Sequence, residues 1–118
     1  MSEFTIKDSG QRQEFETGSK RDTNEGKSRP DLISPYFQER LGHHLAKGAK
    51  KYGENNWAKG QPLKRYMESL ERHLMLAKMG KVDEDHLSAI AFNVMGIIDH
   101  EERINLGLLP EELDNRNS

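Results

Sequence analysis

The amino-acid sequence predicts an all-α protein, and three observations support this fold class. Apolar residues recur with the period of an amphipathic helix in three stretches, a glycine follows each stretch, and no stretch alternates apolar and polar residues as a strand does. Hydrophobic residues make up 33% of the 118 residues and charged residues 32%. Because a chain of this length buries a modest part of its surface, we expect a helical bundle whose core is completed by oligomerisation.

The first helix is expected over residues 31–52. Ser34 and Pro35 suit the N-cap and the first position of a helix, and Gly53 suits its end. The apolar positions of this stretch share helical spacing and are Leu32, Ile33, Tyr36, Phe37, Leu41, Leu45 and Ala49. The other two expected helices cover residues 63–79, ended by Gly80, and a stretch from Asp83 or Glu84 to about Asn105.

The predicted organisation has three parts: a polar arm at residues 1–29, a helical catalytic domain at residues 30–107 and an acidic tail at residues 108–118. The composition of the arm is typical of a disordered segment. It also carries three cations around a glycine, which would close over phosphates if the arm orders on binding: Arg21, Lys27 and Arg29.

Composition excludes several classes of protein. The chain has no cysteine, which rules out a disulfide framework, a thiolate metal site and a cysteine nucleophile. It has no apolar run of membrane-spanning length and no signal-peptide pattern at its start, so the cytoplasm is the expected location. The net charge of −2 does not favour nucleic-acid binding, although the cluster of Lys47, Lys50 and Lys51 suits a phosphorylated small molecule.

A pair of carboxylates on the second expected helix indicates a metal site. Glu68 and Glu71 lie three residues apart and are therefore neighbours on the helix surface. They would form a solvated face if Glu68 merely paired with Arg72. Methionines continue this face, which indicates contact with protein, and buried carboxylates need a compensating cation. Packing against Asp85 of the third helix would gather three acids, which suit Mg²⁺ or Mn²⁺.

The third expected helix carries a polar stripe in which small residues leave space for a ligand. Its members are Asp85, His86, Ala89, Asn93, Gly96 and His100. The alternative is purely structural: His86 would cap the fold, and Asn93 would make one buried hydrogen bond.

Taken together, these residues resemble a known family. The run Gly48-Ala-Lys-Lys-Tyr-Gly-x-x-Asn-Trp-x-Lys-Gly-x-Pro62 is followed by Tyr66-x-x-Ser-x-x-Arg-His73 and by Asp83-Glu-Asp-His-Leu-x-Ala-x-x-x-Asn93. Upstream stand Phe15-x-Thr-Gly-x-x-Arg-Asp and Gly26-Lys-x-Arg-x-Asp-Leu32. In order and spacing, the pattern is similar to phage and bacterial MazG-like enzymes of the MazZ type, which are dATP/dGTP diphosphohydrolases of the all-α nucleotide pyrophosphatase superfamily. The resemblance covers about residues 12–105.

The resemblance implies cleavage of a purine deoxynucleoside triphosphate between its α- and β-phosphates by a homodimer or homotetramer. It implies Mg²⁺ or Mn²⁺, with more than one ion per site. The net charge and the lack of a long apolar run, rather than the resemblance, predict no nucleic-acid and no membrane partner. In phages that replace adenine with 2-aminoadenine, such an enzyme supplies dGMP in the host cytoplasm.

One departure from the superfamily affects the expected ligand set. The usual pattern is Glu-Glu-x-x-Glu followed by Glu-x-x-Asp, whereas here the first half is Met67-Glu68-x-x-Glu71. The second half is absent, so Asp83, Asp85, His86 and Asn93 would share its role. We therefore expect Glu68, Glu71 and Asp85 to be catalytic metal ligands, with Asp83 beside them.

The remaining candidates are expected to bind substrate. Cations suited to phosphate are Lys51, Lys59 and Arg72, beside the three of the arm. Trp57 would stack on a base, although a lone tryptophan is more often a core residue. Asn56 and Asn93 offer donors and acceptors to a purine or sugar, and His73 and His86 would orient a ligand or water.

Two other functions stay open from the sequence. One is a helical module that binds a nucleotide or a protein without turnover. The other is a phosphohydrolase of another type with histidine metal ligands, for which His43, His44 and His86 lack the usual short spacing.

Overall fold

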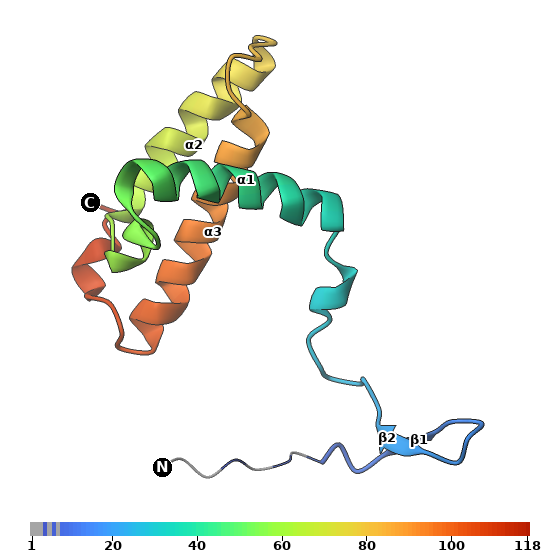
Figure 1. Ribbon diagram of the computed structural model, residues 1–118. Helices are drawn as coiled ribbons and strands as arrows, with labels where there is room; N and C mark the ends of the chain where they lie inside the picture. Colours follow the sequence, from blue (N-terminus) through green and yellow to red (C-terminus); the bar gives the residue numbers. More distant parts are fainter. Residues whose placement is uncertain (1–3, 5, 7) are drawn as a thin grey trace. The chain divides into compact units, whose positions relative to one another are not determined.

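The computed structural model describes Phe4, Ile6 and residues 8–118 (Figure 1). The all-α prediction is confirmed: the described residues form three α-helices, α1 (Pro35–Tyr52), α2 (Leu63–Lys78) and α3 (His86–Asn105). Two compact units divide between Ile33 and Ser34. No helix of the described part is both long and apolar enough to cross a membrane.

The first unit contains a small antiparallel hairpin of β1 (Arg12–Glu14) and β2 (Lys20–Asp22). The expectation that the chain has no strand is wrong here. The strands carry no alternating apolar pattern, because they have no buried face: nearly all their side chains are exposed. A turn joins the strands at Phe15, whose N–H donates to the Ser19 carbonyl at 2.8 Å. Arg12 adds ion pairs to Asp22 at 2.7 Å and to Asp8 at 2.6 Å.

Helix α1 begins four residues after the start of the expected range, and the expected N-cap at Ser34 with Pro35 as the first helical residue is confirmed. The Ser34 hydroxyl accepts a hydrogen bond from the Phe37 N–H at 3.3 Å, so Ser34 is the N-cap and Pro35 the first helical residue. The residue before a proline is disfavoured in the helical region, which separates the earlier stretch from α1. That stretch contains only a short 3₁₀ turn at Pro30–Leu32.

The ends of α2 and α3 follow the same capping pattern. Gly80 takes a φ of +75°, and the N–H of Lys81 after it donates to the Leu76 carbonyl at 3.0 Å. Gly107 takes a φ of +73°, and the N–H of Leu108 donates to the Arg103 carbonyl at 2.8 Å. Both are Schellman motifs, for which glycine is preferred because of the left-handed backbone. The prediction that Gly80 ends the second helix is confirmed.

Within the second unit, α2 and α3 run antiparallel along each other, and α1 lies across them (Figure 1). The apolar core is small and lies between α2 and α3: Leu63, Tyr66 and Ile97 are buried, with Phe92 packed against them. Gly96 gives the ring of Tyr66 room to approach the α3 backbone. Close helix packing in this fold therefore depends on one small residue facing one large residue.

The remaining large apolar side chains are mostly exposed in the single chain. Those on the three helices include Tyr36, Phe37, Met67, Leu74, Met75, Leu87, Val94 and Ile98. Soluble domains seldom leave so many large apolar side chains in water without a partner surface.

The residues after α3 fold back onto the helices. The Asn115 side chain accepts a hydrogen bond from the Lys64 N–H at the start of α2, at 3.0 Å. Arg116 pairs with Glu101 of α3 at 2.8 Å and with Asp114 at 2.7 Å. Side-chain acceptors thereby supply a partner for one of the backbone N–H groups that a helix start leaves unpaired.

Gly96→Ala is expected to lower the free energy of unfolding by about 1–3 kcal/mol, because the added carbon overpacks the core. The Cβ atom of an alanine at position 96 would lie 2.7 Å from Cζ of the buried Tyr66 ring and closer still to Cε1. Thermal unfolding followed by circular dichroism measures the effect. Gly48→Ala in α1 is the matched control, since its added carbon meets nothing within 4 Å. Equal melting temperatures for the wild type and Gly96→Ala would contradict this packing.

Candidate functional site

A pocket of about 650 Å³ lies between α1, the loop after it and α3. Its lining includes aromatic rings, small residues of α1 and side-chain amides, and we call it the aromatic pocket. The ring-bearing and amide residues are His44, Tyr52, Asn55, Asn56, Trp57, Gln61 and Phe92. This volume falls within the range of small-molecule sites.

The loop that carries Trp57 is held in place from α3. His100 is 0% exposed, and its Nε2 accepts a hydrogen bond from the Gln61 N–H at 3.1 Å. Arg103 donates to the Ala58 carbonyl at 2.8 Å. The Trp57 ring lies edge-on to Phe92 at 6.3 Å and stacks with His100 at 6.4 Å. Trp57 is thus half-buried, part of the packing and part of the pocket wall.

His44 brings a titratable group into the aromatic pocket. Its ring centroid lies 5.4 Å from that of Phe92. Burial lowers the pKa of His44, and the negative charges of Asp85 and Glu84 only partly oppose this. A neutral imidazole at pH 7 therefore lines the pocket, with one nitrogen able to donate and the other to accept.

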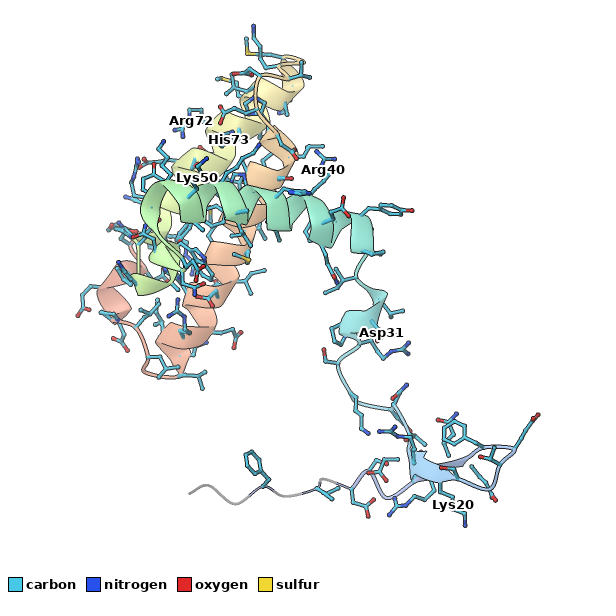
Figure 2. All side chains as sticks on the ribbon, in the orientation of Figure 1. Lys20, Asp31, Arg40, Lys50, Arg72 and His73 are labelled. Atoms are coloured by element: carbon cyan, nitrogen blue, oxygen red, sulfur yellow. The ribbon has the colours of Figure 1, made fainter. Side chains whose placement is uncertain are left out.

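A second pocket, of about 620 Å³, is lined mostly by ionisable residues, and we call it the charged pocket. It lies between α1, the α2–α3 connection and the start of α3. Its cations are Arg40, Lys47 and Lys81, and its ionisable partners are Asp83, Glu84, Asp85 and His86. Figure 2 labels Arg40 on α1 and His73 on α2.

Asp85 is fully engaged within the chain. Arg40 binds it through two hydrogen bonds, from Nε at 3.0 Å and from Nη2 at 2.5 Å. Asp85 is also the N-cap of α3, where its carboxylate accepts from the Ser88 N–H at 3.2 Å and the Ser88 hydroxyl at 2.7 Å. The Arg40 guanidinium, followed by Ser88, holds the pKa of Asp85 well below its usual range.

Two histidines meet where α2 and α3 come together at the connection. Nδ1 of His73 lies 2.9 Å from Nδ1 of His86, and Nε2 of His86 lies 3.1 Å from the Asp83 carboxylate. His86 is 3% exposed. Burial lowers the pKa of His73, against the raising effect of Glu84. The hydrogen bond from His86 lowers the pKa of Asp83.

The expected group of Glu68, Glu71 and Asp85 is not brought together within one chain. Glu68 pairs with Arg65 at 2.6 Å on the exposed surface of α2, and Glu71 is exposed. Among the described residues, the group of three whose donor atoms lie within 4.8 Å of one another is His73, Glu84 and His86. The assignment of the three acids to metal stays a prediction.

Helix geometry explains this separation. The face of α2 that contacts α3 carries Tyr66, Ser69 and His73. At about 100° per residue, Glu68 and Glu71 lie roughly 130° and 170° away from the centre of that face. They therefore share the outer face of α2 with exposed methionines, while the charged pocket opens beside α3.

The other expected binding residues are dispersed. Asn56 and Trp57 both line the aromatic pocket, whereas Asn93 is 3% exposed and donates to the Ser69 hydroxyl at 3.1 Å and the Ala89 carbonyl at 2.9 Å. Within the chain, Asn93 therefore makes buried hydrogen bonds, as the structural alternative expects. All the cations that were expected to bind phosphate are exposed: Lys51, Lys59, Arg72 and, in the first unit, Arg21, Lys27 and Arg29. Within that unit, Arg29 pairs with Asp31 at 2.8 Å.

Sequence reasoning missed Arg40, Lys81 and Glu84 as pocket residues and treated His73 only as an orienting group. The spacing of Arg40 gave a signal, because residues seven apart lie on the same face of a helix and Arg40 is seven residues before Lys47. Nothing in the sequence indicates that His73 and His86 face each other, because that requires the packing of α2 on α3.

A family model described as dATP/dGTP diphosphohydrolase, N-terminal matches residues 17–107. This match covers most of the chain, so the chain belongs to that family. The family name denotes hydrolases of dATP and dGTP, and it confirms the resemblance to dATP/dGTP diphosphohydrolases. No curated protein and no solved structure matches the chain significantly.

Asp85→Ala is expected to destabilise the chain by about 1–2 kcal/mol, because it removes the N-cap of α3. Asp85→Ser keeps a capping oxygen but loses the ion pair with Arg40, so it should cost less, within about 1 kcal/mol. Chemical denaturation at pH 7 measures both. An equal loss in the two variants would contradict the capping role.

The same substitution gives a pH prediction. The pKa of Asp85 is lower in the folded chain than in the unfolded chain, so its stabilisation is present above about pH 4. It is lost as pH falls through the lowered folded-state pKa. The stability difference between the wild type and Asp85→Ala should therefore shrink in acid, and denaturation curves across an acid series would show this.

Proposed function

We propose that this chain is a metal-dependent nucleotide pyrophosphohydrolase that cleaves dGTP or dATP between the α- and β-phosphates. The products are the deoxynucleoside monophosphate and pyrophosphate. The observation that carries the proposal is the family match over residues 17–107, a span that includes the walls of both pockets.

The aromatic pocket suits a purine base and its sugar. Trp57 and Phe92 present ring surfaces, and the amides of Asn55, Asn56 and Gln61 offer both donors and acceptors to a purine edge. His44 adds a neutral ring nitrogen on the same wall. An apolar cavity with a few polar groups is the common form of a nucleoside-sized site.

The phosphates need cations near this pocket. Lys51 lies in the last turn of α1 beside the pocket residue Tyr52, and Lys59 lies two residues after Trp57. Both lysines are exposed, and their long side chains can follow a phosphate. We assign phosphate contact to them and to Arg72, whereas phosphate contact by the cations of the arm stays a sequence prediction.

The metal of this reaction would neutralise charge on the phosphates and activate a water. Glu68 and Glu71 fit Mg²⁺ or Mn²⁺, because they are neighbouring exposed carboxylates with oxygen donors. Glu68 would exchange its ion pair with Arg65 for the metal, and that pair lies on the exposed surface, where ion pairs contribute little. Asp83 has an exposed carboxylate as well, whereas Asp85 would have to give up Arg40 to bind an ion. The residues of the outer face of α2 therefore fit the metal best.

We also propose that this outer face is buried in a homodimer or homotetramer. Met67, Leu74 and Met75 are exposed on the same side of α2 as Glu68 and Glu71. A second copy packed there would cover these apolar side chains and bring further donors to the carboxylates. The site for Mg²⁺ or Mn²⁺ would then be complete only in the oligomer.

The MazG-like relationship, the phage association and a supply of dGMP for 2-aminoadenine synthesis rest on the sequence resemblance. They extend the proposal to a biological role in the cytoplasm of an infected host. The reaction itself does not depend on that role.

Incubating the full chain with each of the eight common triphosphates and Mg²⁺ or Mn²⁺ tests the reaction. We expect pyrophosphate together with dGMP or dAMP, measured by chromatography of the products. Release of single phosphate would overturn the proposed bond cleavage. Stabilisation by a nucleotide without turnover would instead support a binding module.

Glu71→Gln is expected to lower turnover by about 100-fold or more, the size typical of losing a key electrostatic group. Glu102→Gln is the matched control, because Glu102 is also an exposed helical glutamate but lies outside both pockets and the outer face of α2. Circular dichroism should show the same helical content in both variants. Unchanged turnover in Glu71→Gln would remove Glu71 from the reaction.

A further inference from the structure

We propose that His73, His86 and Glu84 form a site for a divalent transition-metal ion, separate from the carboxylates on the outer face of α2. The three residues come from different elements: the middle of α2, the connection and the first residue of α3. One donor atom from each lies within 4.8 Å of the others. The Schellman motif at Gly80 turns the chain back so that these elements meet.

The tautomer of His86 prepares it to bind a cation. Its Nε2 lies 3.1 Å from the Asp83 carboxylate, which can only accept, so Nε2 carries the proton. Nδ1 of His86 then carries no proton, and its lone pair faces Nδ1 of His73. A carboxylate on the far nitrogen is the usual way in which a metal-binding histidine is oriented and made more basic.

The distance between the two imidazoles suits a shared ion. Their Nδ1 atoms are 2.9 Å apart. Two nitrogens that each lie about 2.0–2.1 Å from one ion are separated by roughly 2.8–3.4 Å for coordination angles between square and tetrahedral. In the absence of an ion, the same distance fits a hydrogen bond in which His73 Nδ1 donates its proton to His86 Nδ1. A bound ion would take the place of that proton between the two nitrogens.

The donor set indicates the class of ion. Two imidazole nitrogens and one carboxylate oxygen favour Zn²⁺, Fe²⁺, Co²⁺ or Mn²⁺, whereas Mg²⁺ prefers oxygen alone. Three protein ligands leave positions for water or another group, as in catalytic rather than structural zinc sites. Glu84 is exposed and His86 is buried, so the site has a closed inner side and an open outer side.

The open side faces the charged pocket. Glu84 and His86 both line that pocket, together with the cations Arg40, Lys47 and Lys81. Arg40 is already paired with Asp85, so Lys47 and Lys81 are the cations beside the free positions of the ion. They suit an anionic oxygen ligand such as a phosphate. That a substrate phosphate is this ligand rests on the proposed function, whereas binding of the ion does not.

Titration of the metal-free full chain with Co²⁺, in the absence of nucleotide, tests the site. We expect visible d–d absorption that saturates with one ion per chain and is displaced by Zn²⁺. His73→Gln and Glu84→Gln should weaken binding at least about tenfold. Glu84 is exposed, so Glu84→Gln keeps the test valid if a histidine variant fails to fold.

His43→Gln is the matched control, because His43 is an exposed histidine on α1 that lines neither pocket. Wild-type affinity in Glu84→Gln and His73→Gln, or loss of the spectrum only in Glu71→Gln, would overturn the site. The assay contains no triphosphate, so a chain that binds Co²⁺ but releases no pyrophosphate would overturn the proposed reaction and leave the metal site supported.

Discussion

The Tyr66 ring packs directly over Gly96, and the separation of α2 and α3 depends on this contact. The apolar core around it is small, and the hydrogen bond from Asn93 to Ser69 is a further contact between the two helices. The meeting of His73 with His86 lies further along the same pair of helices. Because protein interiors are close-packed, a change of one carbon at position 96 would be felt along the whole pair.

Buried polar groups extend this constraint to the aromatic pocket. His100 is completely buried, and its nitrogens contact the Gln61 N–H of the loop and the neighbouring Asp99. A buried imidazole without partners would be costly, so the loop and α3 order each other. Trp57 and Phe92 thus form a pocket wall that is held by the same helices as the core.

The two faces of α2 present different ligand chemistry. The inner face of α2 packs against α3 and carries the imidazole of His73. The outer face carries Glu68 and Glu71 beside exposed methionines. Nitrogen donors favour transition metals and carboxylates favour Mg²⁺ or Mn²⁺. We therefore propose that one helix serves two kinds of metal site, of which only the inner one can form within a single chain.

Local patterns in the sequence determined the three helices, the N-cap at Ser34 and the stop at Gly80, because these depend on residues within a few positions of one another. The sequence did not predict the β1–β2 hairpin, because short exposed strands carry no alternation of apolar and polar residues. The packing of α2 on α3 places His73 against His86 and leaves Glu68 on the opposite side of α2, and no pattern in the sequence indicates this. Sequence periodicity shows which residues share a face, but packing between helices selects which face meets its neighbour.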